Sequence, residues 1–116
     1  MDSKKKAFII QLLRRGTYRW WGRWGAEKRS KLPERNTYFC ESCGVIGGKK
    51  DFQMDHIIPI VDPEKGFEGF DKYIDRMFCE ADGFQRLCKP CHEDKTAKEN
   101  STRKESKKKK RLDKKK

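Results

Sequence analysis

Residues 40–43 read Cys-Glu-Ser-Cys, and residues 88–92 read Cys-Lys-Pro-Cys-His. Two Cys-x-x-Cys pairs in a short chain are typical of a structural zinc site, because tetrahedral zinc needs four soft ligands and each pair supplies two. We therefore expect one structural zinc ion, held by Cys40, Cys43, Cys88 and Cys91. The fifth cysteine, Cys79, has no partner in this pattern and is interpreted as a small buried apolar residue.

The composition predicts one small domain that needs a metal to hold it together. Of 116 residues, 34% are hydrophobic and 41% are charged, which leaves little material for an apolar core. Residues 1–6 are polar and form no signal segment, so we expect a reducing cytoplasm in which the cysteines serve as thiolate ligands. The apolar runs are too short to cross a bilayer, so no membrane span is predicted.

Positive charge is concentrated at the two ends of the chain. The net charge is +12, yet residues 31–100 carry eleven Lys and Arg against fourteen acids. Residues 1–30 carry nine against two, and residues 101–116 carry ten against two. We therefore expect the flanks to supply the affinity for a polyanion such as nucleic acid.

The N-terminal segment combines an amphipathic helix with a basic and aromatic run. Apolar residues between Lys4 and Arg15 follow helical spacing, and this helix either docks on the domain or binds a partner protein. In residues 14–25 cations alternate with rings, an interleaving that suits phosphate clamping and base stacking. The alternative is that the Trp side chains fill a small core. The candidate nucleic-acid contacts here are Arg14, Arg15, Arg19, Trp20, Trp21 and Arg23.

The central region alternates between strand and helix patterns. Residues 52–55 and 84–87 read as short strands, and residues 70–78 have the spacing of an amphipathic helix that covers the core. A second helix is predicted to begin within the Cys88–Cys91 turn, with Pro90 in its first turn, and to run to about Asn100. Lys95 lies on its polar face as a further candidate nucleic-acid contact. In a regular strand Asp55 and His56 point to opposite sides, so both serve one site only if the strand bends or ends there.

Three short runs, at 55–56, 85–88 and 91–96, together resemble the HNH endonucleases, which have a ββα-metal fold. The resemblance covers about half of the chain. It implies that His56 is the general base and that Asp55 and His92 ligate a divalent ion such as Mg²⁺ or Mn²⁺. The alternative is that the two histidines are structural or bind zinc. Residues 61–67 are similar to the linker of small HNH proteins that bacteriophages encode beside their DNA-packaging genes.

One position departs from this family pattern, because Gly83 stands where the family has Asn. The site is then inactive, or Asp82 takes over as an oxygen ligand, or water fills the position; we favour Asp82 or water. On this basis Asn at position 83 is expected to raise activity.

These patterns predict an α+β protein with a small ββα-metal domain and a structural zinc. We expect a basic N-terminal helix and linker at 1–36, the HNH domain at 37–100 and a disordered, Lys-rich tail at 101–116. The resemblance implies a monomeric, phage-encoded endonuclease in the host cytoplasm that hydrolyses double-stranded DNA and works with terminase and portal proteins. The alternative is a zinc-stapled DNA-binding module with a degenerate site.

Overall fold

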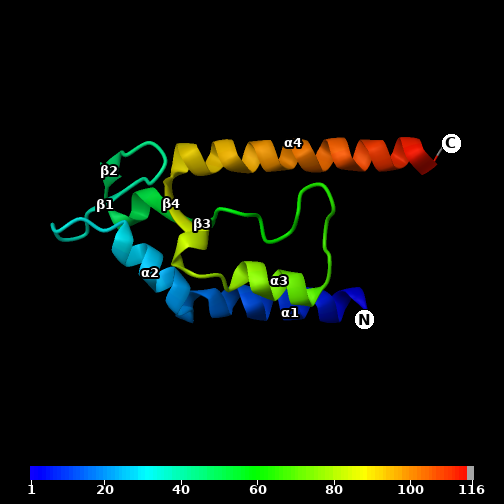
Figure 1. Ribbon diagram of the computed structural model, residues 1–116, viewed down its shortest axis with the longest axis horizontal. Coiled ribbons are helices and arrows are strands. Elements are labelled where there is room, and N and C mark those ends of the chain that lie inside the picture. The colour runs from blue at the N-terminus through cyan, green and yellow to red at the C-terminus, as the bar shows by residue number, and fades with distance from the viewer. Residues whose placement is uncertain (115–116) are drawn as a thin grey trace.

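The computed structural model describes residues 1–114 as helices around two small antiparallel sheets (Figure 1). The helices are α1 (Ser3–Gly16), α2 (Trp21–Arg29), α3 (Phe70–Met77) and α4 (Lys89–Lys114), and the strands are β1 (Tyr38–Phe39), β2 (Ile46–Gly47), β3 (Phe52–His56) and β4 (Phe84–Cys88). Short 3₁₀ turns lie at Thr17–Arg19, Lys49–Asp51 and Ala81–Gly83. This architecture confirms the predicted α+β class.

The β3–β4 pair and the helix that follows it form the ββα unit. β3 pairs with β4 in antiparallel register from Phe52 opposite Cys88 to His56 opposite Phe84, and β4 passes directly into α4. The main buried cluster contains Cys40, Phe52, Leu87 and Cys88, with Tyr38 and Cys91 packed against it. Because half of these residues are cysteines, the small apolar core surrounds the predicted zinc ligands.

A second packing region joins the N-terminal helices to α3 and the segment after it. The indole N–H of Trp20 donates to the carbonyl of Cys79, and the ring makes an edge contact with Phe78 at 5.8 Å. A Cβ at Gly22 would lie 2.2 Å from the same carbonyl oxygen, so only glycine permits this close approach. Helix α2, which makes this contact, has no apolar periodicity that predicts it from the sequence.

Helix α1 lies beside α3 (Figure 1). The two alternatives for this helix are that it docks on the domain and that it binds a partner protein. Ile9, Ile10 and Leu13 are half-buried, whereas Phe8 and Leu12 remain 59% and 50% exposed. The helix therefore docks on the domain with one side and leaves apolar side chains on the other.

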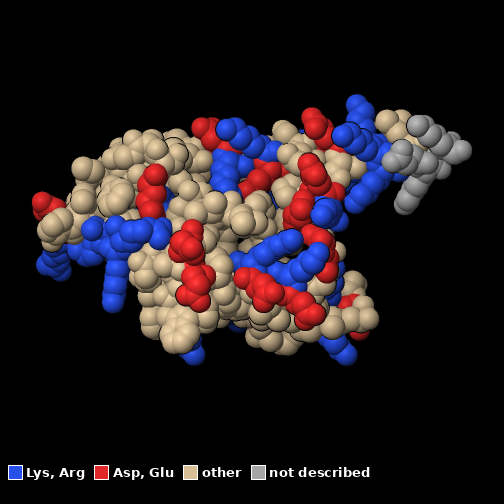
Figure 2. Space-filling view, in the orientation of Figure 1, with Lys and Arg blue, Asp and Glu red and all other residues tan. Residues whose placement is uncertain are grey.

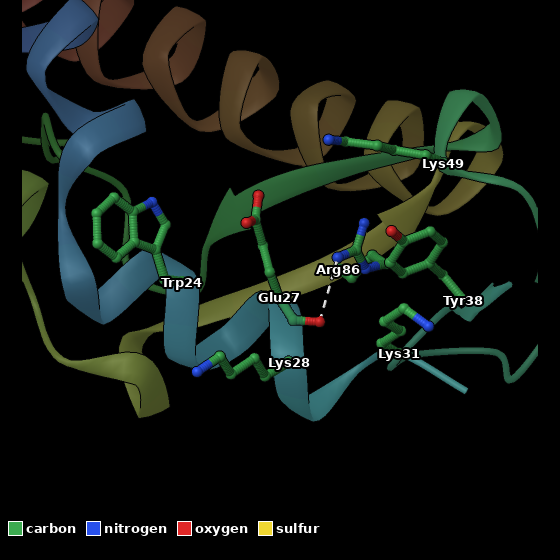
Figure 3. A pocket seen from close by; sticks show the side chains of 7 residues that line it. All are labelled: Trp24, Glu27, Lys28, Lys31, Tyr38, Lys49 and Arg86. Carbon is green, nitrogen blue, oxygen red and sulfur yellow. Dashed lines mark hydrogen bonds between the residues drawn. The ribbon is translucent and has the colours of Figure 1, made fainter. Parts of the chain in front are cut away.

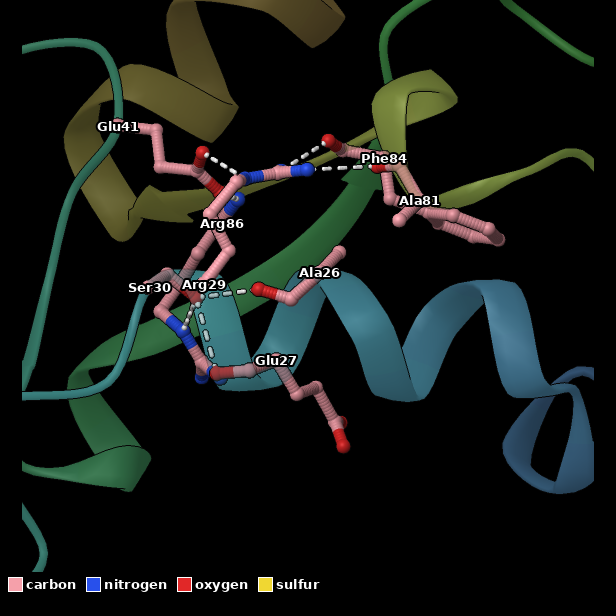
Figure 4. A network of polar contacts seen from close by, with 8 residues as sticks. All are labelled: Ala26, Glu27, Arg29, Ser30, Glu41, Ala81, Phe84 and Arg86. Atoms are coloured by element: carbon pink, nitrogen blue, oxygen red, sulfur yellow. Dashed lines mark hydrogen bonds and ion pairs between the residues drawn. The ribbon is translucent and has the colours of Figure 1, made fainter.

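Two arginines connect α2 to the first Cys pair and to β4 (Figure 4). Arg29 donates to both carboxylate oxygens of Glu41, at 2.8 and 3.0 Å, and to the carbonyls of Ala81 and Phe84 at 2.8 and 2.7 Å. Arg86 is buried and donates from Nε to Ser30 Oγ at 2.7 Å. Glu41 also accepts from the backbone N–H of Arg86 at 2.9 Å, so Glu41 links Arg29 to β4.

The predicted disorder of 101–116 is corrected by the structure, in which α4 continues to Lys114. No Gly or Pro interrupts the chain after Pro90, and Lys, Arg and Glu are good helix formers. Polar contacts such as Arg103 with Asn100 at 2.8 Å support the helix, and Ser106 donates to the carbonyl of Glu64 in the facing loop. The last two residues of the predicted tail, Lys115 and Lys116, lie outside the described residues.

The Arg29 network predicts a measurable loss of stability when its centre is removed. Arg29→Ala deletes four hydrogen bonds, two of them to a carboxylate, and should lower the free energy of unfolding by about 2 kcal/mol in zinc-saturated urea denaturation. Arg23→Ala is the matched control, because Arg23 makes one ion pair with Glu27 at 3.5 Å and should cost below about 0.5 kcal/mol. Equal losses in the two variants would contradict the proposed anchoring.

Candidate metal centre and catalytic cleft

The four predicted cysteines meet at one point in the structure. Their sulfur atoms all lie within 4.8 Å of one another, and Cys43 Sγ is 3.7 Å from Cys88 Sγ. Sulfurs bound at about 2.3 Å around tetrahedral zinc are about 3.8 Å apart, so this donor set fits zinc. Within residues 1–114 this is the one group of three or more potential ligands close enough to hold a metal ion together.

The thiols of Cys40 and Cys91 have pKa values shifted in opposite directions. Burial opposes ionisation of Cys40, but backbone N–H donors from Cys43, Cys88 and Ser42 outweigh it and lower the pKa of this thiol to about 6. The hydrogen bond to Cys88, together with burial and the neighbouring thiols, raises the pKa of Cys91 to about 12. A first thiolate therefore disfavours the last, and a divalent ion would remove that repulsion.

A second cluster lies where β3 faces the first turns of α4. Asp55 Oδ1 is 3.9 Å from His92 Nε2. Its other oxygen, Oδ2, accepts from Gln85 Nε2 at 3.2 Å and lies 3.1 Å from Lys95 Nζ. Gln85 and Lys95 thereby orient the carboxylate so that the remaining oxygen faces the histidine.

The Asp55–His92 pair has the chemistry of two ligands to one divalent ion. Two neighbouring ligand atoms that each lie about 2.1 Å from an ion are about 3.0 to 3.4 Å apart, so the observed 3.9 Å would shorten by about 0.5 Å or more when an ion binds. A carboxylate oxygen and an imidazole nitrogen both suit Mn²⁺ and related ions. Two protein ligands leave the other coordination positions to water and substrate oxygens.

His56 ends β3 beside this pair, and its ring is fixed. Its Nε2 lies 2.8 Å from the carbonyl oxygen of Met77, and the ring packs on Phe84 at 4.6 Å. Since a carbonyl only accepts, Nε2 carries the hydrogen, and in the neutral ring Nδ1 keeps a free lone pair. Burial lowers the pKa of His56, against the opposing effects of the Met77 carbonyl and Asp55, so the neutral form is favoured.

A cleft of about 210 Å³ joins Asp55 and His56, though not His92, to basic residues from the N-terminal helix α1 and from α4. Asp55 and His56 both line it, because β3 ends at His56. The polar residues that share its wall are Arg14, Lys95, Glu99 and Arg103. Figure 2 shows the molecule from the same side as Figure 1. Acidic and basic side chains lie next to one another over the middle of the side that is seen, and Lys and Arg are gathered toward the C-terminal end of α4.

Comparison with curated proteins finds a relative encoded by a bacteriophage. The chain is 32% identical over 69 residues to a protein of Lactococcus phage SK1 named as a probable HNH endonuclease. The resemblance to the HNH endonucleases is confirmed. The match covers 60% of this chain and 65% of the phage protein, so just under two thirds of that relative is represented. A scan of protein-family models finds no match, and no solved structure matches.

The structure does not bring Asp82 to the Asp55–His92 pair. Asp82 is exposed on the 3₁₀ turn Ala81–Gly83, and its charge contributes to raising the pKa of Arg29 and of Cys79. No group of three potential ligands in residues 1–114 includes it. Gly83 has a packing role instead, since a Cβ there would lie 2.5 Å from Cys79 Sγ.

The predicted nucleic-acid residues occupy three different environments. Trp20 is packed between helices as described above, whereas Trp21 is 68% exposed. Arg15 and Arg19 are exposed, and Arg23 stacks over the Tyr18 ring at 4.5 Å. Arg14 and Lys95 are the two that reach the cleft. Trp20 therefore fits the alternative in which a Trp fills a small core, and Trp21 is exposed, as a base-stacking residue must be.

Sequence reasoning missed two residues of the cleft wall, Arg103 and Tyr73. Arg103 is one helical turn beyond Glu99, so extending the polar face of α4 past Asn100 would have found it. Tyr73 belongs to the apolar face of α3, yet its hydroxyl is buried without a hydrogen-bond partner among the described residues. No sequence signal distinguishes such a tyrosine from an ordinary core residue.

Zinc should be required for folding. We expect about one zinc per chain by metal analysis, and we expect Cys88→Ser to unfold the domain, because structural zinc contributes on the order of 10 kcal/mol to such folds. Cys79→Ser is the matched control, since Cys79 lies outside the cluster. A Cys88→Ser protein with native zinc content and native melting would contradict the assignment.

The contact at Gly83 reverses the expectation drawn from the family pattern. Gly83→Asn should destabilise the protein by about 1 to 3 kcal/mol through overpacking against Cys79, rather than restore a site. In a thermodynamic cycle of unfolding measurements, Cys79→Ala should recover part of that loss because it removes the clashing sulfur. Strict additivity of the two free-energy changes would show that the contact does not affect stability. Asp82→Ala is the control at the neighbouring position and should leave the free energy of unfolding nearly unchanged.

Proposed function

We propose that this protein is a metal-dependent HNH-type endonuclease that hydrolyses phosphodiester bonds of DNA. The observation that carries the proposal is the arrangement at the end of β3. Asp55 Oδ1 faces His92 Nε2 at 3.9 Å, and both Asp55 and the base candidate His56 line one cleft. The phage relative supports the same class of activity.

His56 is the general base in this proposal. Its Nε2 is engaged with the Met77 carbonyl at 2.8 Å, which leaves Nδ1 to accept a proton from the attacking water. Burial keeps the ring neutral by lowering its pKa, so the base form is present near neutral pH. Its contact with Phe84 restricts rotation and keeps that lone pair in one direction.

Asp55 and His92 would hold the divalent ion, Mg²⁺ or Mn²⁺. When bound, such an ion supplies positive charge to the phosphoryl and leaving oxygens. Arg14, Lys95 and Arg103 line the same cleft and would neutralise the strand on either side of the scissile bond. Duplex DNA is the proposed substrate, and the basic flanks provide affinity that depends on salt rather than on sequence.

The biological setting is part of the same proposal. The chain is similar to a Lactococcus phage protein, which supports a phage origin and the cytoplasm of an infected cell. We propose that it acts as a monomer beside terminase and portal proteins during DNA packaging. No helix in residues 1–114 is long and apolar enough to cross a membrane.

One observation favours the alternative of a zinc-stapled DNA-binding module. The ammonium group of Lys95 already lies 3.1 Å from Asp55, so the carboxylate has a cationic partner without any metal. Hydrogen bonds to Glu99 and Asp55 outweigh burial and raise the pKa of Lys95, which keeps it charged. A divalent ion must therefore share Asp55 with this lysine.

A plasmid-nicking assay with Mn²⁺ or Mg²⁺ separates the two functions. His56→Ala should lower the nicking rate on the order of 100-fold or more because it removes the base, and His92→Ala should do likewise by removing a metal ligand. Neither change touches the four cysteines, so zinc content should stay at one per chain.

Gln53→Ala is the matched control, because Gln53 lies on the same strand with an exposed side chain. It should nick at the parental rate. Equal nicking by the parent, His56→Ala and His92→Ala would reject the nuclease and leave the binding module.

A further inference from the structure

A second pocket lies between α2, β1 and β4 and has no lining residue in common with the catalytic cleft (Figure 3). Its volume is about 390 Å³, within the range of sites that hold small molecules. Its walls are formed by Trp24, Glu27, Lys28, Lys31, Tyr38, Lys49 and Arg86. We call it the α2 pocket. Side chains alternate along a strand, so Arg86 faces α2 while its neighbour Gln85 faces Asp55.

Positive charge dominates the α2 pocket. Four of its seven lining residues are Lys or Arg, and the one acid, Glu27, is 3.5 Å from Arg23 in an ion pair. Arg86 is only 4% exposed, and in residues 1–114 it forms no ion pair with a carboxylate. Its recorded side-chain hydrogen-bond acceptors are neutral, namely Ser30 Oγ at 2.7 Å and the Glu27 carbonyl at 3.4 Å.

A buried guanidinium without a directly paired carboxylate is costly, and an anion in the pocket would offset that cost. Burial lowers the pKa of Arg86 and outweighs the opposing charges of Glu27, Tyr38 and Glu41, so these neighbours offset the cost of burial only in part. Arg86 also stacks over the Tyr38 ring at 4.2 Å, so its plane is fixed and its donors are directed. A planar, immobilised guanidinium is suited to phosphate oxygens.

An aromatic ring stands at the other end of the pocket from Arg86 and Tyr38 (Figure 3). Trp24 is 49% exposed, and its indole N–H donates to the Tyr18 carbonyl at 2.9 Å. The ring is therefore held in place while part of its surface remains open. A fixed ring together with cations is the combination that binds a nucleotide, with the base on the ring and the phosphate on the cations.

We propose that the α2 pocket binds a nucleoside phosphate, with its phosphate toward Arg86 and the lysines and its base against Trp24. The unit is one nucleotide of a single strand or a free nucleotide, and both present the same chemistry. The site is separate from the catalytic cleft, so the proposal stands whether or not that cleft cuts DNA. An acidic peptide would match the charge but would make no use of the open indole.

Binding of a fluorescein-labelled hexathymidylate, followed by anisotropy, tests this proposal on the full-length zinc-loaded protein. Lys28→Gln with Lys49→Gln should weaken binding about 10-fold and lower the slope of log affinity against log salt by about 1.4, since each phosphate contact on a single strand contributes about 0.7. The matched control is Lys4→Gln with Lys5→Gln, which removes the same charge from exposed positions on α1. The control should retain affinity within about twofold.

The aromatic contact is tested separately. Trp24→Leu should weaken hexathymidylate binding by about 5-fold or more, and Trp24→Phe should restore most of it because a ring is present again. Displacement by thymidine monophosphate alone would identify a free-nucleotide site, and displacement only by oligonucleotides would identify a strand site.

Three results would overturn the proposal. One is that Lys28→Gln with Lys49→Gln and the control Lys4→Gln with Lys5→Gln weaken hexathymidylate binding equally, which would mean that binding depends on total charge and not on the α2 pocket. Another is unchanged binding in Trp24→Leu with an unchanged melting temperature. The third is displacement of the label by oligoglutamate as effectively as by hexathymidylate.

Discussion

Four thiols within 4.8 Å of one another impose the constraint on which this fold depends. They come from the loop after β1, the end of β4 and the first turn of α4, so one ion would tie together segments nearly fifty residues apart. The apolar core around them is too small to replace that bond, because three of its members are the cysteines themselves. With an ion bound there, the stability of the domain and the occupancy of the metal site would form a single equilibrium.

The same constraint positions the catalytic candidates. β4 carries Gln85 three residues before Cys88, and α4 carries His92 directly after Cys91. With β4 fixed against β3, Gln85 reaches Asp55, and His92 and Lys95 approach it from the helix. The residues that surround Asp55 thus belong to the same strand and helix as Cys88 and Cys91, so the four-cysteine cluster would fix their backbone positions.

Much of this could be predicted from spacing alone. The two Cys pairs, the strands at 52–56 and 84–88 and the helix from Phe70 all correspond to local patterns with a clear physical period. Three features could not be predicted, because each depends on tertiary contacts. Trp20 is packed because Cys79 offers a carbonyl, Arg86 is buried because Ser30 and Tyr38 accommodate it, and Gly83 is required by the neighbouring sulfur of Cys79.

Because α4 is continuous, it fixes distances between charged residues along its length. A straight helix advances about 1.5 Å per residue, so the Lys107–Lys110 run is held roughly 25 Å along the axis from His92. A flexible tail would let those charges touch a polyanion anywhere within reach, whereas a helix allows them to touch it only at a set interval. At about 3.4 Å per step along a nucleic-acid strand, that interval corresponds to roughly seven or eight nucleotides. Helix α4 therefore fixes the distance between these lysines and His92, next to the four-cysteine cluster.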